Sequence, residues 1–215
     1  MMYLINAIYF KSLWSCKFDV SQTRPGTFYL PDASTVQADL MKGDKINYNV
    51  YRDQNVTVLE LPYINSKYSM VIVEPSQTKI LLNLDTVTWN GWMGKLTAGN
   101  GPVIMPKFKF SYNILLNNAL GSLGMDNAFS DAADFTGINP AGNLHISKVM
   151  HKAYVAVDES GTEAAAVTSV TISLTAALGP PTITIDHPFI FVIREMKTGL
   201  ILFAGTVNNP LLPGS

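Results

Sequence analysis

Cysteine is almost absent from this sequence, which has a single one, Cys16. One thiol excludes a disulfide within the chain and any zinc site built from several cysteines. Catalytic motifs are missing as well. The histidines, His145, His151 and His187, share no metal-ligand spacing, and there is no glycine-rich phosphate loop or nucleophile-elbow serine. We therefore expect no cofactor, no metal site and no catalytic residue.

Charge is also scarce, at 14% of residues, with 15 lysines and arginines against 16 acidic residues. The basic residues form no cluster, which argues against a nucleic-acid partner or an anionic membrane surface. No apolar run approaches the roughly 20 residues of a membrane-spanning helix. Hydrophobic residues nevertheless make up 47% of the chain, so we expect a large buried core.

Strand patterns dominate what is present. Met2–Phe10 is almost continuously apolar, which is typical of a strand covered on both faces, and Leu144–Asp158 reads as a second long strand. Helix patterns are few, the best being Tyr112–Leu123 with Gly124 as its C-terminal cap. The pattern predicts an α+β fold that is mostly β. Because these helices are too few to cover such strands, we expect the chain to be part of a longer polypeptide.

The segment from Gly161 to Leu178, GTEAAAVTSVTISLTAAL, has the composition of a strand but the setting of a loop. Its even positions grow steadily more apolar while its odd positions stay mostly polar, as in a strand with one buried face. Glu-Ser-Gly precedes it and Gly-Pro-Pro follows it, which are loop signals. The segment therefore has the features of a piece of chain with two states.

His151 and Asn6 are polar residues within the two long apolar strands. His151 can be a neutral core histidine with a hydrogen-bonded ring. It can also be one half of a polar latch between neighbouring strands, with Asn6 as its partner. The residues alone leave both interpretations open.

Several segments, in this order and at compatible separations, resemble the serpin family of protease inhibitors: NAIYFKSLW (6–14), MPKFKF (105–110), LGSLGMDNAFSDAADFTGI (120–138), HISKVMHKAYVAVDESGTEAAA (145–166), DHPFIFVIRE (186–195) and TGLILFAGTVNNP (198–210). The resemblance covers essentially the whole chain. It implies that residues 1–215 are the C-terminal part of a single serpin domain, beginning at strand 3 of the large sheet A. The implied fold has sheets A, B and C, with the N-terminal helical portion missing from this chain.

The resemblance makes residues 160–179 the reactive-centre loop. A serine protease, or a cysteine protease, would attack the loop and form an acyl-enzyme, and the cleaved loop would insert into sheet A between Met2–Phe10 and Leu144–Asp158. The protein would then be a suicide substrate and not an enzyme, with the protease as its covalent partner. Two alternatives remain: a non-inhibitory binding or chaperone-like serpin, or an inactive fragment that needs its N-terminal portion as a partner chain. Serpins act inside and outside cells, and of the two we expect secretion.

The resemblance also assigns roles to individual residues. Asn6 and His151 match the shutter of sheet A, and Trp14 matches the breach tryptophan, where insertion begins. The hinge consists of Gly161, Thr162, Glu163, Ala164, Ala165 and Ala166. Small residues suit entry into a sheet, because a buried charge would cost several kcal/mol. We expect Thr162 to face inward and Glu163 outward.

The reactive bond is predicted between Thr175 and Ala176, with Ala177 and Leu178 as alternative positions. The loop contains no arginine or lysine, which argues against trypsin-like proteases, whose specificity pockets require a cation. Elastase-, subtilisin- or chymotrypsin-like proteases fit these side chains better.

Overall fold

The computed structural model describes residues 1–76, 84–162 and 180–212. The chain divides into two compact units. The first consists chiefly of Met1–Tyr9 and Ser111–Tyr154, and the second of Phe10–Phe110 and Val155–Gly214. Strands outnumber helices in the described residues, in agreement with the predicted class. Within these same ranges, no helix has both the length and the apolar character needed to span a bilayer.

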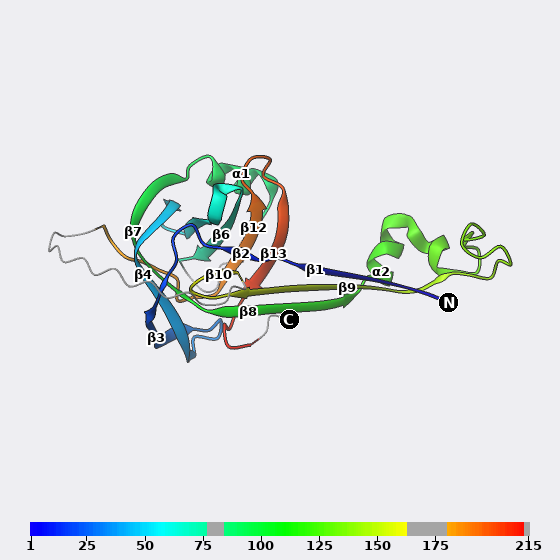
Figure 1. The fold of residues 1–215 in the computed structure, drawn as a ribbon, viewed down its shortest axis with the longest axis horizontal. Helices are drawn as coiled ribbons and strands as arrows, with labels where there is room; N and C mark the ends of the chain where they lie inside the picture. Colours follow the sequence, from blue (N-terminus) through cyan, green and yellow to red (C-terminus); the bar gives the residue numbers. More distant parts are fainter. Residues whose placement is uncertain (77–83, 163–179, 213–215) are drawn as a thin grey trace. The chain divides into compact units, whose positions relative to one another are not determined.

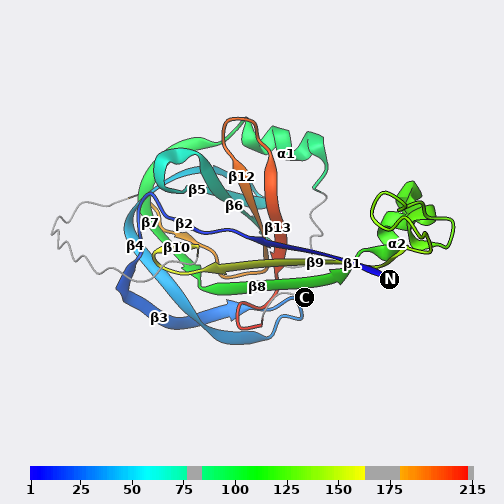
Figure 2. The same ribbon diagram turned by 45° about the vertical axis from the view of Figure 1, so that its right-hand side comes forward.

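The second unit is built on an eight-stranded sheet in the order β11-β7-β4-β5-β6-β12-β13, with β3 paired to β4 (Figures 1 and 2). Its members are β3 (Asp19–Tyr29), β4 (Thr35–Arg52), β5 (Val56–Pro62), β6 (Tyr68–Pro75), β7 (Thr97–Pro106), β11 (Ile183–Thr184), β12 (Phe189–Glu195) and β13 (Ile201–Val207). Most neighbours are antiparallel, whereas β11 runs parallel to β7.

Strands β5 and β6 are buried along almost their whole length, because each places apolar side chains on both faces of the sheet, alongside the buried Glu60 and Glu74. On one face lies a cluster of valines: Val56, Val58, Val71, Val73 and Val192. Helix α1 (Thr86–Met93) supplies Trp89 and Trp92 to cover this cluster. Asp85 caps the helix by accepting the N–H of Thr88 at 2.7 Å. Tyr63, which belongs to the site described below, directly follows β5.

In the first unit, β1 (Met2–Tyr9) pairs parallel with β9 (Ile146–Val157), and the two lie side by side in both views (Figures 1 and 2). Strand β8 (Phe108–Leu115) also pairs with β9. Both predicted long strands are therefore found. The expected cover on both faces of the first strand is not seen among the described residues, since Tyr3 is 57% and Ile5 67% exposed.

The helix predicted at Tyr112–Leu123 is found only in its second half. Its first residues belong to β8, and α2 is limited to Asn117–Leu120, followed by the short helical turns η2 (Gly121–Met125) and η3 (Asp126–Phe129). Pairing with β9 overrides the local helical pattern, and the Asn117 side chain strengthens it by bonding the β9 backbone on both sides, at Ser147 O and Val149 N (2.9 Å each). Gly124 does adopt a positive φ of 95°.

Candidate hinge and breach site

The predicted hinge begins in a tight turn at the end of β9. The Asp158 carboxylate accepts the backbone N–H groups of Ser160 (2.8 Å) and Gly161 (3.2 Å), and the Asp158 N–H donates to the Gly161 carbonyl at 2.9 Å. This side-chain-to-backbone pattern is typical of an aspartate-stabilised turn. The chain then reverses into β10 (Gly161–Thr162).

Strand β10 lies between two other strands. Thr162 pairs antiparallel with Val157 of β9, while Gly161 and Thr162 pair antiparallel with Leu13 and Ser12 of β2 (Ser12–Leu13). The first two hinge residues are therefore already strand residues within a sheet.

Gly161 is required by both its conformation and its surroundings. Its φ is +155°, and a Cβ at this position would lie 2.2 Å from the Ser12 carbonyl oxygen and 2.6 Å from the Leu13 Cα. Both are backbone atoms of a paired strand and cannot rotate away. No residue larger than glycine fits without moving β2.

Thr162 is fully buried and hydrogen-bonded. Its Oγ1 lies 2.7 Å from the Tyr63 hydroxyl oxygen. The Tyr63 ring stacks on Trp14 with centroids 4.6 Å apart and planes 5° from parallel, and the Trp14 indole N–H donates to the Asp158 carbonyl at 2.9 Å. Burial raises the pKa of Tyr63 far above its usual value, so its hydroxyl stays neutral. Thr162, Tyr63, Trp14 and Asp158 thus form a chain of contacts, which we call the hinge latch.

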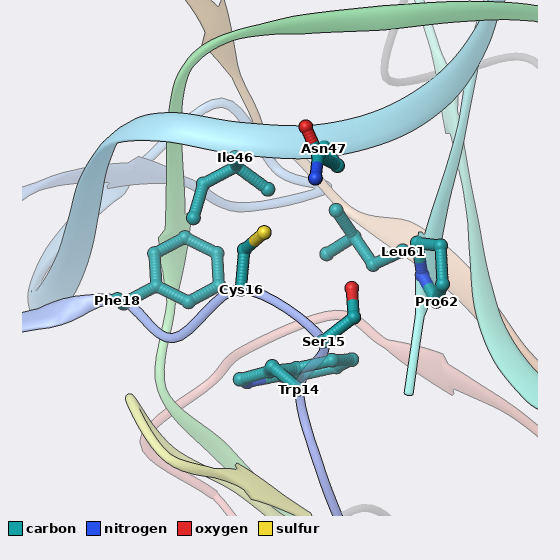
Figure 3. Close-up of a pocket in the computed structure, with 8 residues that line it drawn as sticks. All are labelled: Trp14, Ser15, Cys16, Phe18, Ile46, Asn47, Leu61 and Pro62. Atoms are coloured by element: carbon teal, nitrogen blue, oxygen red, sulfur yellow. The ribbon is translucent and has the colours of Figure 1, made fainter. Parts of the chain in front are cut away.

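Behind Trp14 lies a small hollow lined by Trp14, Ser15, Cys16, Phe18, Ile46, Asn47, Leu61 and Pro62 (Figure 3). Figure 3 shows Cys16 directed into it, between Phe18 and Leu61. The hollow leaves no room for a water molecule, and Cys16 is half-buried there. It is packing space beside Trp14.

Glu159 ties the hinge turn to β3 and to the segment between β7 and β8. Its side chain is buried, accepts the Thr23 hydroxyl at 2.6 Å and pairs with the Lys107 ammonium at 3.1 Å. Burial opposes ionisation, but the hydrogen bonds from Thr23 and Lys107 outweigh it, so the pKa of Glu159 lies below its usual value. The turn is anchored by a charged carboxylate.

The two predicted shutter residues are opposite each other. Asn6 of β1 and His151 of β9 are register partners in the parallel ladder. Asn6 is exposed and His151 half-buried, so the burial expected of the pair does not hold in the described residues. No side-chain hydrogen bond joins them within the described ranges, and the latch role remains a prediction.

Sequence reasoning identified Trp14 and Thr162 but missed Tyr63 and Glu159. Tyr63 lies 99 residues from Thr162, and nothing in its local pattern marks it. Glu159 could have been found only from its position next to the predicted hinge. The remaining hinge residues, Glu163 to Ala166, and the predicted reactive bond in Thr175–Leu178 lie outside the described residues.

Comparison with known proteins identifies the family. The family model described as "Serpin (serine protease inhibitor)" matches residues 1–210. The chain belongs to the serpin family. The sequence of Serpin-ZXA from Oryza sativa subsp. japonica is 40% identical over 220 residues, covering 96% of this chain and 55% of that protein. This serpin chain therefore spans about half the length of the curated relatives it matches.

Solved serpin structures show the same fold. Serpin48 from the insect Tenebrio molitor superposes with a TM-score of 0.79 at 35% identity, over 96% of this chain and 56% of that one. Human thyroxine-binding globulin superposes with a TM-score of 0.82 at 32% identity, over 97% and 56% of the two chains. The predicted fold and family are confirmed. The family is described as serine protease inhibitors, and a thyroxine-binding globulin is among the solved structures that share its fold.

Proposed function

We propose that this chain carries the protease-trapping machinery of an inhibitory serpin. The protease's serine hydroxyl adds to the carbonyl carbon of Thr175, the amide bond to Ala176 breaks, and the Ala176 nitrogen takes up the proton and leaves as a new amino terminus. An ester then joins the protease to Thr175. Insertion of residues 163–175 into the sheet would distort the protease before water can hydrolyse this ester.

One observation carries the proposal: the hinge has already entered the sheet by two residues. Gly161 and Thr162 both pair with β2 on one side, and Thr162 also pairs with β9 on the other. Continued insertion would extend β10 from an existing end and would not have to nucleate a new strand.

The two observed registers support a single inserted arrangement. Thr162 is opposite both Val157 and Ser12, so antiparallel extension by six residues puts Thr168 opposite both His151 and Asn6. Those two residues are at present paired with each other. The direct β1–β9 ladder would therefore have to open, and two antiparallel pairings would replace one parallel pairing. Antiparallel pairing is slightly more stable per residue, which favours insertion.

The burial of Thr162 supports the parity of the inserted strand. Since Thr162 faces the interior, the even-numbered residues Ala164, Ala166 and Thr168 would follow it inward, and Glu163 and Ser169 would face outward. The even series lacks charge, so it can be buried without an unpaired ion.

The absence of lysine and arginine from the loop supports a protease with an apolar or small specificity pocket. The test is incubation of the chain with pancreatic elastase, subtilisin, chymotrypsin and trypsin, with complexes resolved on denaturing gels. Covalent complexes with the first three and not with trypsin are expected. Mass spectrometry of the released C-terminal peptide then identifies the cleaved bond among Thr175, Ala176, Ala177 and Leu178.

A matched pair of variants tests the insertion itself. Thr168→Arg would bury a charge against Asn6 and His151 and should convert the inhibitor into a substrate that is cleaved without complex formation. Ser169→Arg, one residue on, would face outward and should still trap protease. Equal trapping by both variants would refute the proposed register. Because relatives are about twice as long, the mass of the purified material, measured first, shows whether a second polypeptide accompanies the chain.

The likeness to thyroxine-binding globulin favours a second candidate, a non-inhibitory binding serpin. Such a protein would be cleaved in the loop by every active protease without forming any covalent complex. It would also lack the large rise in melting temperature that loop insertion produces after cleavage.

A further inference from the structure

A second cluster of chemically active side chains, sharing no residue with the hinge latch, lies at the start of β12. Asp186 and His187 belong to the segment that joins β11 to β12, and Glu74 is near the end of β6. The Glu74 Oε1 accepts the backbone N–H groups of both Asp186 and His187, each at 3.0 Å. These bonds bring together residues that are 112 positions apart in the chain.

The three side chains direct donor atoms at one another. His187 Nδ1 lies 2.6 Å from Asp186 Oδ1 and 4.0 Å from Glu74 Oε1. One donor atom from each of the three residues lies within 4.8 Å of the other two. Among the residues that the structure describes, this is the group of histidine and carboxylate side chains close enough to share one ion.

The imidazole is held in place from outside the cluster. The His187 ring stacks on Tyr29, with centroids 4.6 Å apart and planes 15° from parallel. The Tyr29 backbone N–H donates to the Asp186 carbonyl at 2.8 Å, which secures the adjacent backbone. Ligand side chains that are already held in place lose less conformational entropy when an ion binds, so the entropic cost of binding is smaller.

Among the described residues, no lysine or arginine forms an ion pair with the two carboxylates of the cluster. Glu74 is only 8% exposed, and within the described ranges no lysine or arginine nitrogen lies within 4 Å of its carboxylate. A divalent cation would supply the missing positive charge.

We propose that Glu74, Asp186 and His187 bind one divalent transition-metal ion, preferentially Zn²⁺. One imidazole nitrogen and two carboxylate oxygens are donors that zinc accepts, and three protein ligands leave a position for water. The ion replaces the proton between His187 Nδ1 and Asp186 Oδ1. Two ligands on tetrahedral zinc are about 3.3 Å apart, so these atoms must move apart. The Asp186 side chain, 30% exposed, is free to make this adjustment and leaves a path for the ion.

The bound ion would cross-link β6 to the segment entering β12, in addition to the two backbone hydrogen bonds. Ligands that bind only the folded state raise its stability by mass action. Zinc should therefore raise the melting temperature of the second unit.

The test is calorimetric titration of the untagged, chelator-stripped full chain with zinc chloride at pH 7.5. One ion per chain is expected, and His187→Gln and Asp186→Asn should each weaken binding at least tenfold. His145→Gln is the matched control, because His145 is similarly exposed and also has an aspartate neighbour, Asp131, at 3.4 Å. It should bind zinc as the parent does.

Asp186→Asn keeps the backbone contacts of residue 186, so the test does not depend on a variant that fails to fold. Cobalt(II) substitution gives a direct readout, since the visible absorption of a nitrogen- and oxygen-ligated ion should be lost in His187→Gln. Absence of zinc binding by the parent chain would overturn the proposal. So would equal affinities of the parent and the His187→Gln variant.

Discussion

Replacing Tyr63 with phenylalanine would remove one oxygen atom from the hinge latch and leave the rest in place. The phenyl ring keeps the stacking on Trp14, which lies 4.6 Å away between centroids. The Thr162 hydroxyl, fully buried, would lose its hydrogen-bond partner. A buried polar group left without a partner costs about 1–3 kcal/mol, and we expect the free energy of unfolding to fall by that amount.

The complementary change, Thr162→Val, keeps the branched shape and leaves the Tyr63 hydroxyl unpaired instead. The double variant removes both polar groups, so no unsatisfied atom remains. The double variant should therefore lose clearly less free energy of unfolding than the two single variants lose in sum. We expect an interaction energy of about 1–2 kcal/mol in the double-mutant cycle, because the two side chains are in direct contact.

Urea denaturation followed by tryptophan fluorescence measures all four stabilities under one condition. Limited proteolysis adds a local readout, since either single variant should make cleavage after residue 162 faster by loosening the hinge. Strictly additive losses would refute the reasoning, because they would mean that the 2.7 Å contact between Tyr63 and Thr162 contributes no coupling.

Gly161→Ala should lower the free energy of unfolding by about 1–3 kcal/mol through backbone strain, as measured by denaturant titration. Gly137→Ala is the control, since a Cβ at Gly137 meets nothing within 4 Å, and an equal loss in both variants would contradict the argument. Glu60 lies buried in a salt bridge with Arg194 at 2.6 Å. Hydrogen bonds from Asn49, Arg194 and Ser69 outweigh burial and keep the pKa of Glu60 below its usual value of 4.5. The ionised Glu60 therefore contributes its full stabilisation above pH 4.5, and this stabilisation is lost as pH falls through the lowered pKa. Glu60→Gln should thus unfold more easily than the parent at pH 7, with a free energy of unfolding lower by about 3–5 kcal/mol, because a buried ion pair is broken. This difference between parent and variant should shrink towards pH 3. A difference that stays constant with pH would contradict the role given to the ionised Glu60.

The amino-acid pattern was sufficient to predict a strand where local composition and burial agree. The long strand predicted at Leu144–Asp158 is an example, since the structure has β9 at Ile146–Val157. The pattern failed in the first half of Tyr112–Leu123, where helical spacing competes with strand pairing. There the outcome was decided by β9 and by the Asn117 side chain that bonds its backbone.

The sequence by itself determined the family and the mostly-β class, because these depend on residue order and on short-range periodicity. Only the tertiary structure brought Tyr63 to Thr162 and Glu74 to His187, over separations of 99 and 113 residues. Local pattern carries no information about such pairs, since each residue is unremarkable among its neighbours. Their chemistry arises when sheet register brings two distant strands together and excludes water from the polar groups between them.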